Sequence, residues 1–196
     1  MTDLRSTVSS NVHGALLTLQ QIAVLGSPTL RQVFEELLQT CFALFDHRDL
    51  CIRQAAMDLV SDAVEVDPQV FVKGHLELWL GRMLSALADP EARCAALEAL
   101  AAISGHVDTA ALVPYLPAVC EALLRTGHVV QSVDASSPLY NAFIGCVEGL
   151  AVSIGKPFER PGRFLVRLLV GLDASERQFQ GIKRITNALP RLWPFI

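Results

Sequence analysis

The chain is poor in charge, and the little charge that it has is slightly acidic. Only 18% of its 196 residues are charged, and its formal net charge is −4. Because binding to phosphates requires a basic face, this balance argues against a nucleic-acid-binding protein and against docking on anionic lipid. With 52% hydrophobic residues, the chain also has far too much apolar content to be intrinsically disordered.

Long hydrophobic runs and paired cysteines are missing as well. The longest stretch without charge, residues 6–30, is interrupted by Gln20, Gln21 and Pro28. It therefore predicts neither a membrane-spanning helix nor a signal peptide, and we expect a cytoplasmic protein. The five cysteines include no C-x-x-C pair, and each lies in an apolar helical run. There a thiol behaves as a small hydrophobic group, so no disulfide framework is expected.

The signatures of catalysis are incomplete. His47-Arg48-Asp49 looks like a kinase catalytic loop, but Gln54 stands where that loop needs asparagine, and no Asp-Phe-Gly follows. Residues 153–156 match the S-x-x-K of penicillin-recognising enzymes without its companion motifs, and are more simply a helix end closed by glycine. No two histidines stand at metal-ligand spacing. We therefore predict no catalytic residue, no cofactor site and no metal site.

Two alternating helical patterns recur along the chain with a period near 40 residues. The spacing i, i+3, i+4, i+7, i+8, i+11 places one apolar stripe on a helix. It occurs at Ile52, Ala55, Ala56, Leu59, Val60 and Ala63, and again at Ala92, Ala95, Ala96, Ala99, Leu100 and Ile103. A second stripe begins at Leu30, Val72 and Leu112. Two different helices are being repeated.

An aspartate and an arginine four residues apart mark the turns between these helices. The pairs are Asp49 with Arg53, Asp89 with Arg93, and Asp173 with Arg177. An aspartate ahead of an apolar helical stripe can accept the free backbone N–H groups at the start of the helix. The arginine can pair with that aspartate or reach a neighbouring repeat.

This pattern predicts an all-α protein, a HEAT-type α-solenoid in which antiparallel helix pairs stack into a superhelix. We expect about nine helices in a single array over residues 1–196. An unpaired helix at 7–24 precedes pairs at 28–64, 68–104, 108–154 and 161–189. The third pair is longer than the others, and its extra residues, 127–137, have the polar composition of a loop.

Several strings in collinear order resemble the N-terminal HEAT region of target-of-rapamycin (TOR) serine/threonine kinases, which are PI3K-related kinases. They are Val12-His13-Gly14-Ala15-Leu16-Leu17, Phe34-Glu35-Glu36, Asp67-Pro68-Gln69-Val70-Phe71, Ala95-Ala96-Leu97-Glu98-Ala99-Leu100, Tyr115-Leu116-Pro117, Val133-Asp134-Ala135 and Ile154-Gly155-Lys156. The chain departs from the family in having only Gly26-Ser27-Pro28 where TOR proteins often carry a longer insertion. It also lacks their kinase domain, rapamycin-binding region and C-terminal tail.

The resemblance implies a non-catalytic scaffold within a TOR signalling complex in the cytoplasm or near endomembranes. Its implied partners are proteins such as a raptor-like subunit, and no catalytic residue is carried over. The alternative is an unrelated HEAT scaffold, such as a transport receptor, a phosphatase regulatory subunit or a microtubule-binding array. The unpaired first helix and the apolar end Leu192-Trp193-Pro194-Phe195-Ile196 predict a piece of a longer solenoid that self-associates through exposed ends.

Overall fold

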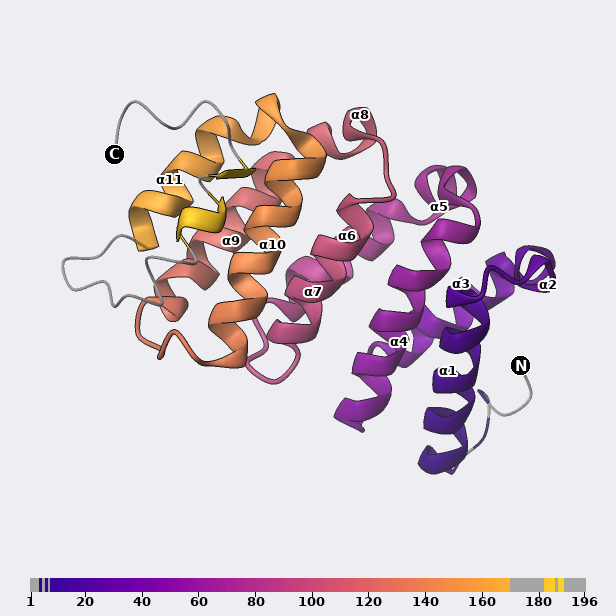
Figure 1. Cartoon of the computed structure of the whole chain (residues 1–196). Helices are drawn as coiled ribbons and strands as arrows, with labels where there is room; N and C mark the ends of the chain where they lie inside the picture. The colour runs from indigo at the N-terminus through magenta and orange to yellow at the C-terminus, as the bar shows by residue number, and fades with distance from the viewer. Residues whose placement is uncertain (1–3, 5, 7, 170–181, 186, 189–196) are drawn as a thin grey trace. The chain divides into compact units, whose positions relative to one another are not determined.

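The computed structural model describes residues 4, 6, 8–169, 182–185, 187 and 188. Among these residues all regular structure is helical: eleven α-helices and short 3-10 turns, with no strand (Figure 1). The helices form two compact units, Met1–Met83 and Leu84–Ile196, and the division falls inside α6 (Leu76–Ala86). None of the described helices is both long enough and apolar enough to span a bilayer.

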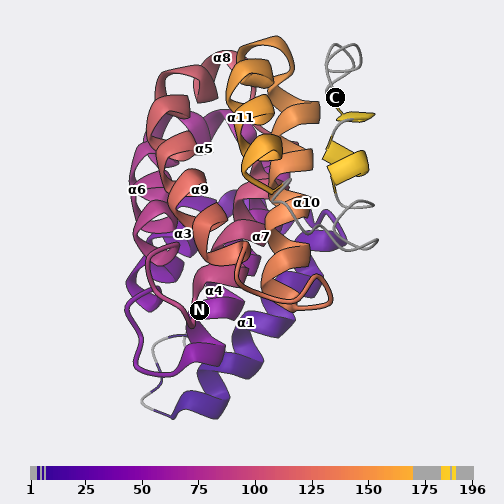
Figure 2. The ribbon, with the colours of Figure 1, turned by 90° about the vertical axis from the view of Figure 1, so that its left-hand side faces the viewer.

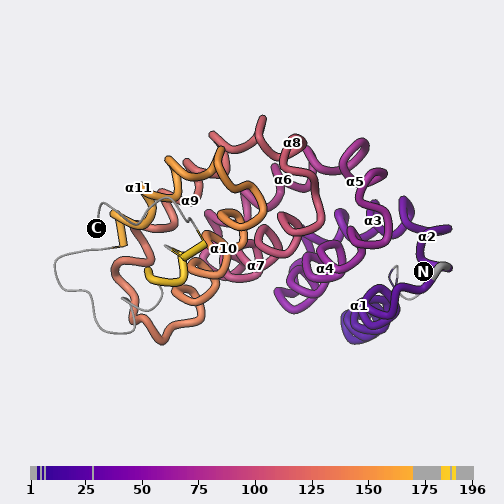
Figure 3. Tube along the Cα trace, turned by 45° about the horizontal axis from the view of Figure 1, so that its top comes forward, coloured from indigo at the N-terminus to yellow at the C-terminus, as the bar shows by residue number. Residues whose placement is uncertain are grey.

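Unit 1 is built around α4 (Leu50–Ala63). This helix packs against α1 (Ser9–Val24) on one side and α3 (Phe34–Leu44) on another, as Figure 3 shows. The predicted stripe of α4 is wholly buried, from Ile52 to Ala63, and so are Val12 and Leu16 of α1. A hydrogen bond of 2.9 Å from Gln20 Nε2 to Asp62 Oδ2 ties α1 to α4 at the edge of this interface.

Unit 2 repeats the arrangement. Its helices are α7 (Arg93–Ser104), α8 (Thr109–Leu112), α9 (Leu116–Val130), α10 (Pro138–Ile154) and α11 (Glu159–Leu169). The most extensive packing joins α7 to α10, while α9 contacts both α10 and α11 (Figure 2). The alanine-rich stripe of α7 is buried in full. Small residues let these helices approach closely: a Cβ on Gly149 of α10 would lie 3.4 Å from the Cβ of Ala101.

Three helices that the sequence predicts as continuous are each divided near their start. The first breaks at Val33, between α2 (Pro28–Gln32) and α3, and the second at His75, between α5 (Pro68–Gly74) and α6. The third breaks at the 3-10 turn Val113–Tyr115. The backbone dihedrals at Val33 (φ −113°, ψ 11°) and His75 (φ −133°, ψ −19°) lie outside the α-helical well. The eleven helices from α1 to α11 therefore correspond to eight of the nine expected helices, three of which are divided.

The loop predicted at residues 127–137 is shorter in the structure. Helix α9 runs on to Val130, because Gly127 is buried in the interface rather than placed in a turn. A Cβ at Gly127 would come within 2.6 Å of Leu168 Cδ2 and 3.3 Å of Phe143 Cζ, so glycine permits the close approach of α10 and α11. The remaining loop ends at Ser137, whose Oγ accepts a hydrogen bond from Tyr140 N and caps α10.

The last predicted helix, at 174–189, falls mostly outside the described residues. Residues 182–185, 187 and 188 are helical, and Arg184 forms an ion pair with Glu148 of α10. The Asp173–Arg177 pair and the end from Leu192 to Ile196 lie outside the described residues.

Candidate protein-interaction surface

The turn before α4 is held by Asp49, as the sequence predicts. Asp49 Oδ1 accepts a hydrogen bond of 3.0 Å from Cys51 N, and Asp49 O accepts one from Arg53 N. The side chain thereby satisfies one of the free N–H groups at the positive end of the helix. The backbone N–H of Asp49 in turn donates to His47 Nδ1, at 3.0 Å.

The turn before α7 uses the same bonds at the same positions. Asp89 Oδ1 accepts from Glu91 N at 3.0 Å, and Asp89 O accepts from Arg93 N. However, α7 itself starts later than α4 does after its aspartate, at Arg93, and its N-cap residue Ala92 offers no side-chain acceptor. The prediction of a direct cap is therefore confirmed at Asp49, whereas Asp89 closes the turn that precedes the helix.

The two arginines reach backward to backbone carbonyls. Arg53 Nη1 donates to His47 O at 3.0 Å, and Arg93 Nε donates to Leu87 O at 2.7 Å. Each acceptor lies six residues before its arginine, and Arg93 Nη2 adds a bond to Ala88 O. Leu87 directly follows α6, whereas His47 lies in the turn three residues after α3, so each guanidinium fastens the turn to the start of the helix that follows it. From the sequence we expected each arginine to pair with the aspartate of its own turn or with a neighbouring repeat. The backbone carbonyls that accept its hydrogen bonds were not predicted.

Neither catalytic look-alike has a catalytic arrangement. His47, Arg48 and Asp49 occupy the turn just described, and Arg48 is exposed. Gly155 closes α10 with a φ of +64°, which confirms that residues 153–156 are a helix end. In the part of the chain that the structure describes, no group of His, Cys, Asp or Glu side chains is arranged to hold a metal ion.

The five cysteines are free thiols, as expected from their spacing. Burial raises the pKa of Cys41 and of Cys146 to about 12, and that of Cys120 to about 11. A thiol that stays protonated at neutral pH is neither a nucleophile nor a metal ligand. Cys41 and Cys146 therefore belong to the core, whereas Cys120 is half-buried and Cys51 is exposed.

A groove in unit 1 opens where the end of α1 meets the 3-10 turn Val64–Val66. Its volume is about 390 Å³, and it is lined by Ala23, Val24, Gly26, Ser27, Arg31, Glu65 and Val66. Arg31 Nη2 donates to Val66 O at 2.9 Å and spans the groove. Beside it Leu25 is 81% exposed and Val24 64% exposed, which gives the groove an apolar lip.

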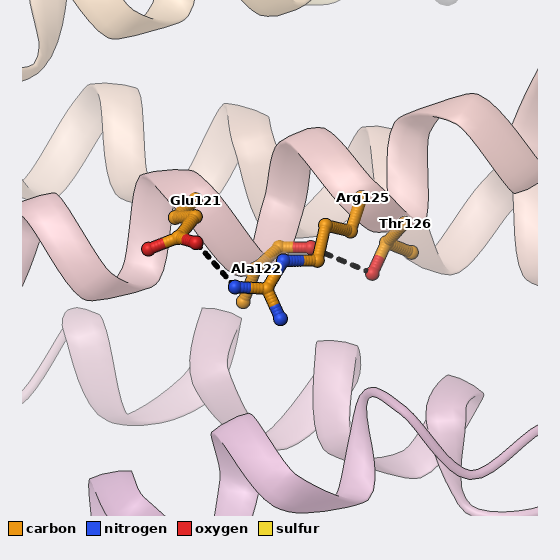
Figure 4. A network of polar contacts seen from close by, with 4 residues as sticks. All are labelled: Glu121, Ala122, Arg125 and Thr126. Carbon is orange, nitrogen blue, oxygen red and sulfur yellow. Dashed lines mark hydrogen bonds and ion pairs between the residues drawn. The ribbon is translucent and has the colours of Figure 1, made fainter.

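A second groove lies within unit 2, between the end of α6 and α9. Its volume is about 140 Å³, and it is lined by Leu84, Leu87, Ala88, Arg93, Ala122, Arg125, Thr126 and Val129. Figure 4 shows the α9 wall: Arg125 forms an ion pair with Glu121 one turn earlier, and Thr126 Oγ1 donates to Ala122 O. The polar groups of this wall are thus paired within α9, and the rest of the second groove's lining is mainly apolar.

Both grooves suit contacts with another protein better than they suit chemistry. Each mixes apolar residues with arginine and has no convergent set of acids, bases or nucleophiles among the residues that line it. Sequence spacing could not reveal them, because their walls come from helices that lie 40 or so residues apart in the chain.

No family model matches the chain. Two curated proteins are similar to it over nearly its whole length. The serine/threonine-protein kinase tor1 of Schizosaccharomyces pombe is 22% identical over 96% of the chain, and the kinase TOR of Arabidopsis thaliana is 22% identical over 98%. The chain spans about 8% of the length of each of these relatives. The predicted similarity to TOR kinases is confirmed over this segment.

Solved structures with the same arrangement of helices are solenoids. Kap121p covers 95% of the chain with 18% of its own, at a TM-score of 0.81 and 15% identity. A designed armadillo repeat protein covers 95% of the chain with 79% of its own, at a TM-score of 0.70 and 18% identity. At this level of identity the likeness shows the fold alone, and it confirms the all-α HEAT-type solenoid that the sequence predicts.

Proposed function

We propose that the chain is a non-catalytic scaffold segment that binds other proteins, as part of a TOR-like kinase complex. One observation carries the proposal: the chain is similar to two TOR kinases over 96–98% of its length. Over that length its described residues form helices with two grooves, one of mixed polar and apolar lining and one mainly apolar, and the lining of neither holds a cluster of catalytic side chains.

Exposed apolar side chains support a binding role. Among them are Leu17, Val24 and Leu25 in unit 1, and Val113, Val152 and Phe164 in unit 2. Solvent-exposed apolar residues next to arginine are typical of the core of a protein interface. Solenoids of this fold do bind proteins: structures of Kap121p have been solved with Pho4p, with Nup53p and with the protease Ulp1p.

For the partner we propose a raptor-like subunit, and for the location the cytoplasm or an endomembrane reached through the complex. The test is calorimetric titration of the purified chain with a purified raptor-like subunit. We expect saturable binding that Leu25→Glu or Val129→Glu weakens, since each would place a charge at the edge of a groove. Absence of binding by the folded chain would refute this partner. Binding of a transport cargo in its place would favour the alternative, an unrelated HEAT scaffold.

The absence of catalysis is tested separately. The chain should show no saturable binding of ATP and Mg²⁺, since the structure gives Asp49 a capping role in place of a metal-binding one. Nucleotide binding that Asp49→Asn abolishes, with the fold intact by circular dichroism, would overturn the non-catalytic assignment.

A further inference from the structure

Helix α11 has two opposite faces. Gly162, Leu165, Val166 and Leu169 are buried, on the side that packs on α9 and α10. Arg160, Phe164 and Arg167 are exposed. Their spacing of i, i+4 and i+7 places them in one row on the side away from the buried residues. Figure 2 shows α11 beside α9 and α10. We call this row the α11 face.

The arginines of the α11 face are unusual in this protein. Seven other described arginines have a recorded polar partner: Arg31, Arg53, Arg82, Arg93, Arg125, Arg163 and Arg184. Among the residues that the structure describes, no such partner is recorded for Arg160 or Arg167. Two guanidinium groups are therefore available on either side of an aromatic ring that is 58% exposed.

This combination has the composition of a binding hot spot. Arginine and aromatic residues are enriched in the energetically important centre of protein interfaces, because both bury apolar surface and arginine also pairs with carboxylates. An aromatic ring between two arginines therefore favours a partner with one apolar side chain between two carboxylates. Lys156, also exposed, adds a third positive charge just before the helix.

The spacing of the two arginines indicates which kind of partner segment would fit the α11 face. Arg160 and Arg167 are seven residues apart, which is about 10.5 Å along a helix axis. A partner helix whose carboxylates are also seven residues apart matches this distance, and a large apolar residue midway between them would lie on Phe164. Anionic membranes are a poorer match, because polybasic lipid-binding segments need four to eight clustered cations. Nucleic acid is poorer still for a chain whose net charge is −4.

We propose that the α11 face binds an acidic amphipathic helix of a partner protein, with carboxylates at i and i+7 around an apolar residue. This inference rests on the proposed scaffold function and names the partner chemistry of one surface. The raptor-like subunit could bind elsewhere on the chain, so the two proposals fail independently.

The test uses the full chain and a fluorescently labelled, alanine-based helical peptide with two glutamates seven residues apart and a leucine midway. We expect saturable binding by fluorescence anisotropy, weakened about tenfold by Phe164→Ala and about a hundredfold by Arg160→Glu with Arg167→Glu. Arg48→Glu is the matched control, because Arg48 is also exposed and without a recorded polar partner but lies in unit 1. It should leave the affinity unchanged. Circular dichroism verifies that each variant is folded.

A charge swap keeps the proposal falsifiable if the double variant binds nothing. A peptide with lysines in place of the glutamates should bind the Arg160→Glu, Arg167→Glu chain and not the original chain. Equal binding of both peptides by the original chain, or full binding after Phe164→Ala and the double substitution, would overturn the proposal. So would preferential binding to phosphatidylserine vesicles, or dimerisation that blocks the peptide.

Discussion

Helices α4 of unit 1 and α7 of unit 2 are copies of one another 40 residues apart, but they begin differently. Helix α4 starts at Leu50, directly after Asp49, whereas α7 starts at Arg93, four residues after Asp89. The hydrogen bonds of the two turns are nevertheless equivalent. In each, the aspartate carboxylate accepts from the backbone N–H two residues further on, and the arginine donates to the carbonyl six residues back. The turn is therefore encoded by these two side chains, separately from where the helix starts.

The two helix starts also differ in sequence. Pro90 follows Asp89 directly, where Leu50 follows Asp49, and residues 90–92 form a turn ahead of α7. Proline at the first helical position does not by itself delay a helix, since α5 begins at Pro68 directly after Asp67. A repeat can thus vary at its helix start while keeping the connection between helices. That separation can be tested by comparing equivalent changes in the two units.

The largest expected effect is on the rates at which buried cysteines are labelled, which compare the stability of unit 1 with that of unit 2. Each unit has one fully buried cysteine, Cys41 in α3 and Cys146 in α10, whereas Cys51 is exposed. Because a reagent attacks the thiolate, Cys41 and Cys146 should react only after their unit opens. With a free energy of unfolding above 5 kcal/mol, labelling should be about a thousandfold or more slower than at Cys51. Mass spectrometry of single-cysteine variants measures both rates.

The same thiols set a pH dependence. Burial raises the pKa of Cys41 and Cys146 from 9.0 to about 12, so the folded chain holds these protons where the unfolded chain releases them. Their contribution is fully present below pH 9 and is lost as the pH rises from 9 to 12, by up to about 1.4 kcal/mol per pH unit for each thiol. Replacing both by alanine should make the denaturation midpoint fall less steeply over that window. An unchanged slope would show that neither thiol is buried.

The sequence could predict which residues are buried but not where the long helices break. The stripes of α4 and α7 follow directly from helical spacing, and all twelve of their apolar residues are buried. Of the three breaks, Pro114 and Pro117 signal the third and Gly74 the second, because proline and glycine interrupt helices. Val33 carries no such signal. Local propensity gives no reason for a break at this residue.

The surface was harder to predict than the core. The i, i+4, i+7 row of Arg160, Phe164 and Arg167 was present in the sequence, but spacing alone does not reveal that no polar partner of these arginines stands among the described residues. The grooves could not be found from spacing, since their walls are distant in the chain. The hydrogen-bond acceptors of Arg53 and Arg93 were not predicted, because they are backbone carbonyls. Every residue has a backbone carbonyl, so the sequence does not indicate which one is used.

The next effect tests whether α4 and α7 are packed equally. Ala56 and Ala96 stand at equivalent positions and are both fully buried. Tryptophan at either position should overpack the interface and destabilise the protein by about 3 kcal/mol. Denaturant titration gives the change in free energy of unfolding for each. Tryptophan at the exposed Glu98 is the control, and an unchanged midpoint for Ala96→Trp would contradict its position in the core.

Removing the arginines tests the bonds that the two turns share. Arg53→Ala and Arg93→Ala should each cost about 2 kcal/mol, because a charged hydrogen bond to a carbonyl is lost. Lysine should restore little at Arg93, since one ammonium group cannot reproduce the planar guanidinium that reaches both Leu87 O and Ala88 O. Thermal denaturation measures both series. Full rescue by lysine at Arg93 would show that charge alone holds this turn.

The smallest effect, and the most selective, is the difference between the aspartates. Asp49→Ala removes a true N-cap and should cost about 1 kcal/mol, within the usual range for such caps. Asp89→Ala removes an acceptor from a turn that precedes α7 and should cost about half as much, since Ala92 already stands at the N-cap. Asparagine at either position keeps the acceptor and should restore most of the loss. Equal losses at the two aspartates would mean that both act on their helices in the same way, and that the later start of α7 has no energetic consequence. The companion variant is Pro90→Leu, which places after Asp89 the residue type that follows Asp49. If proline delays α7, Asp89→Ala in that background should cost as much as Asp49→Ala does in the original chain.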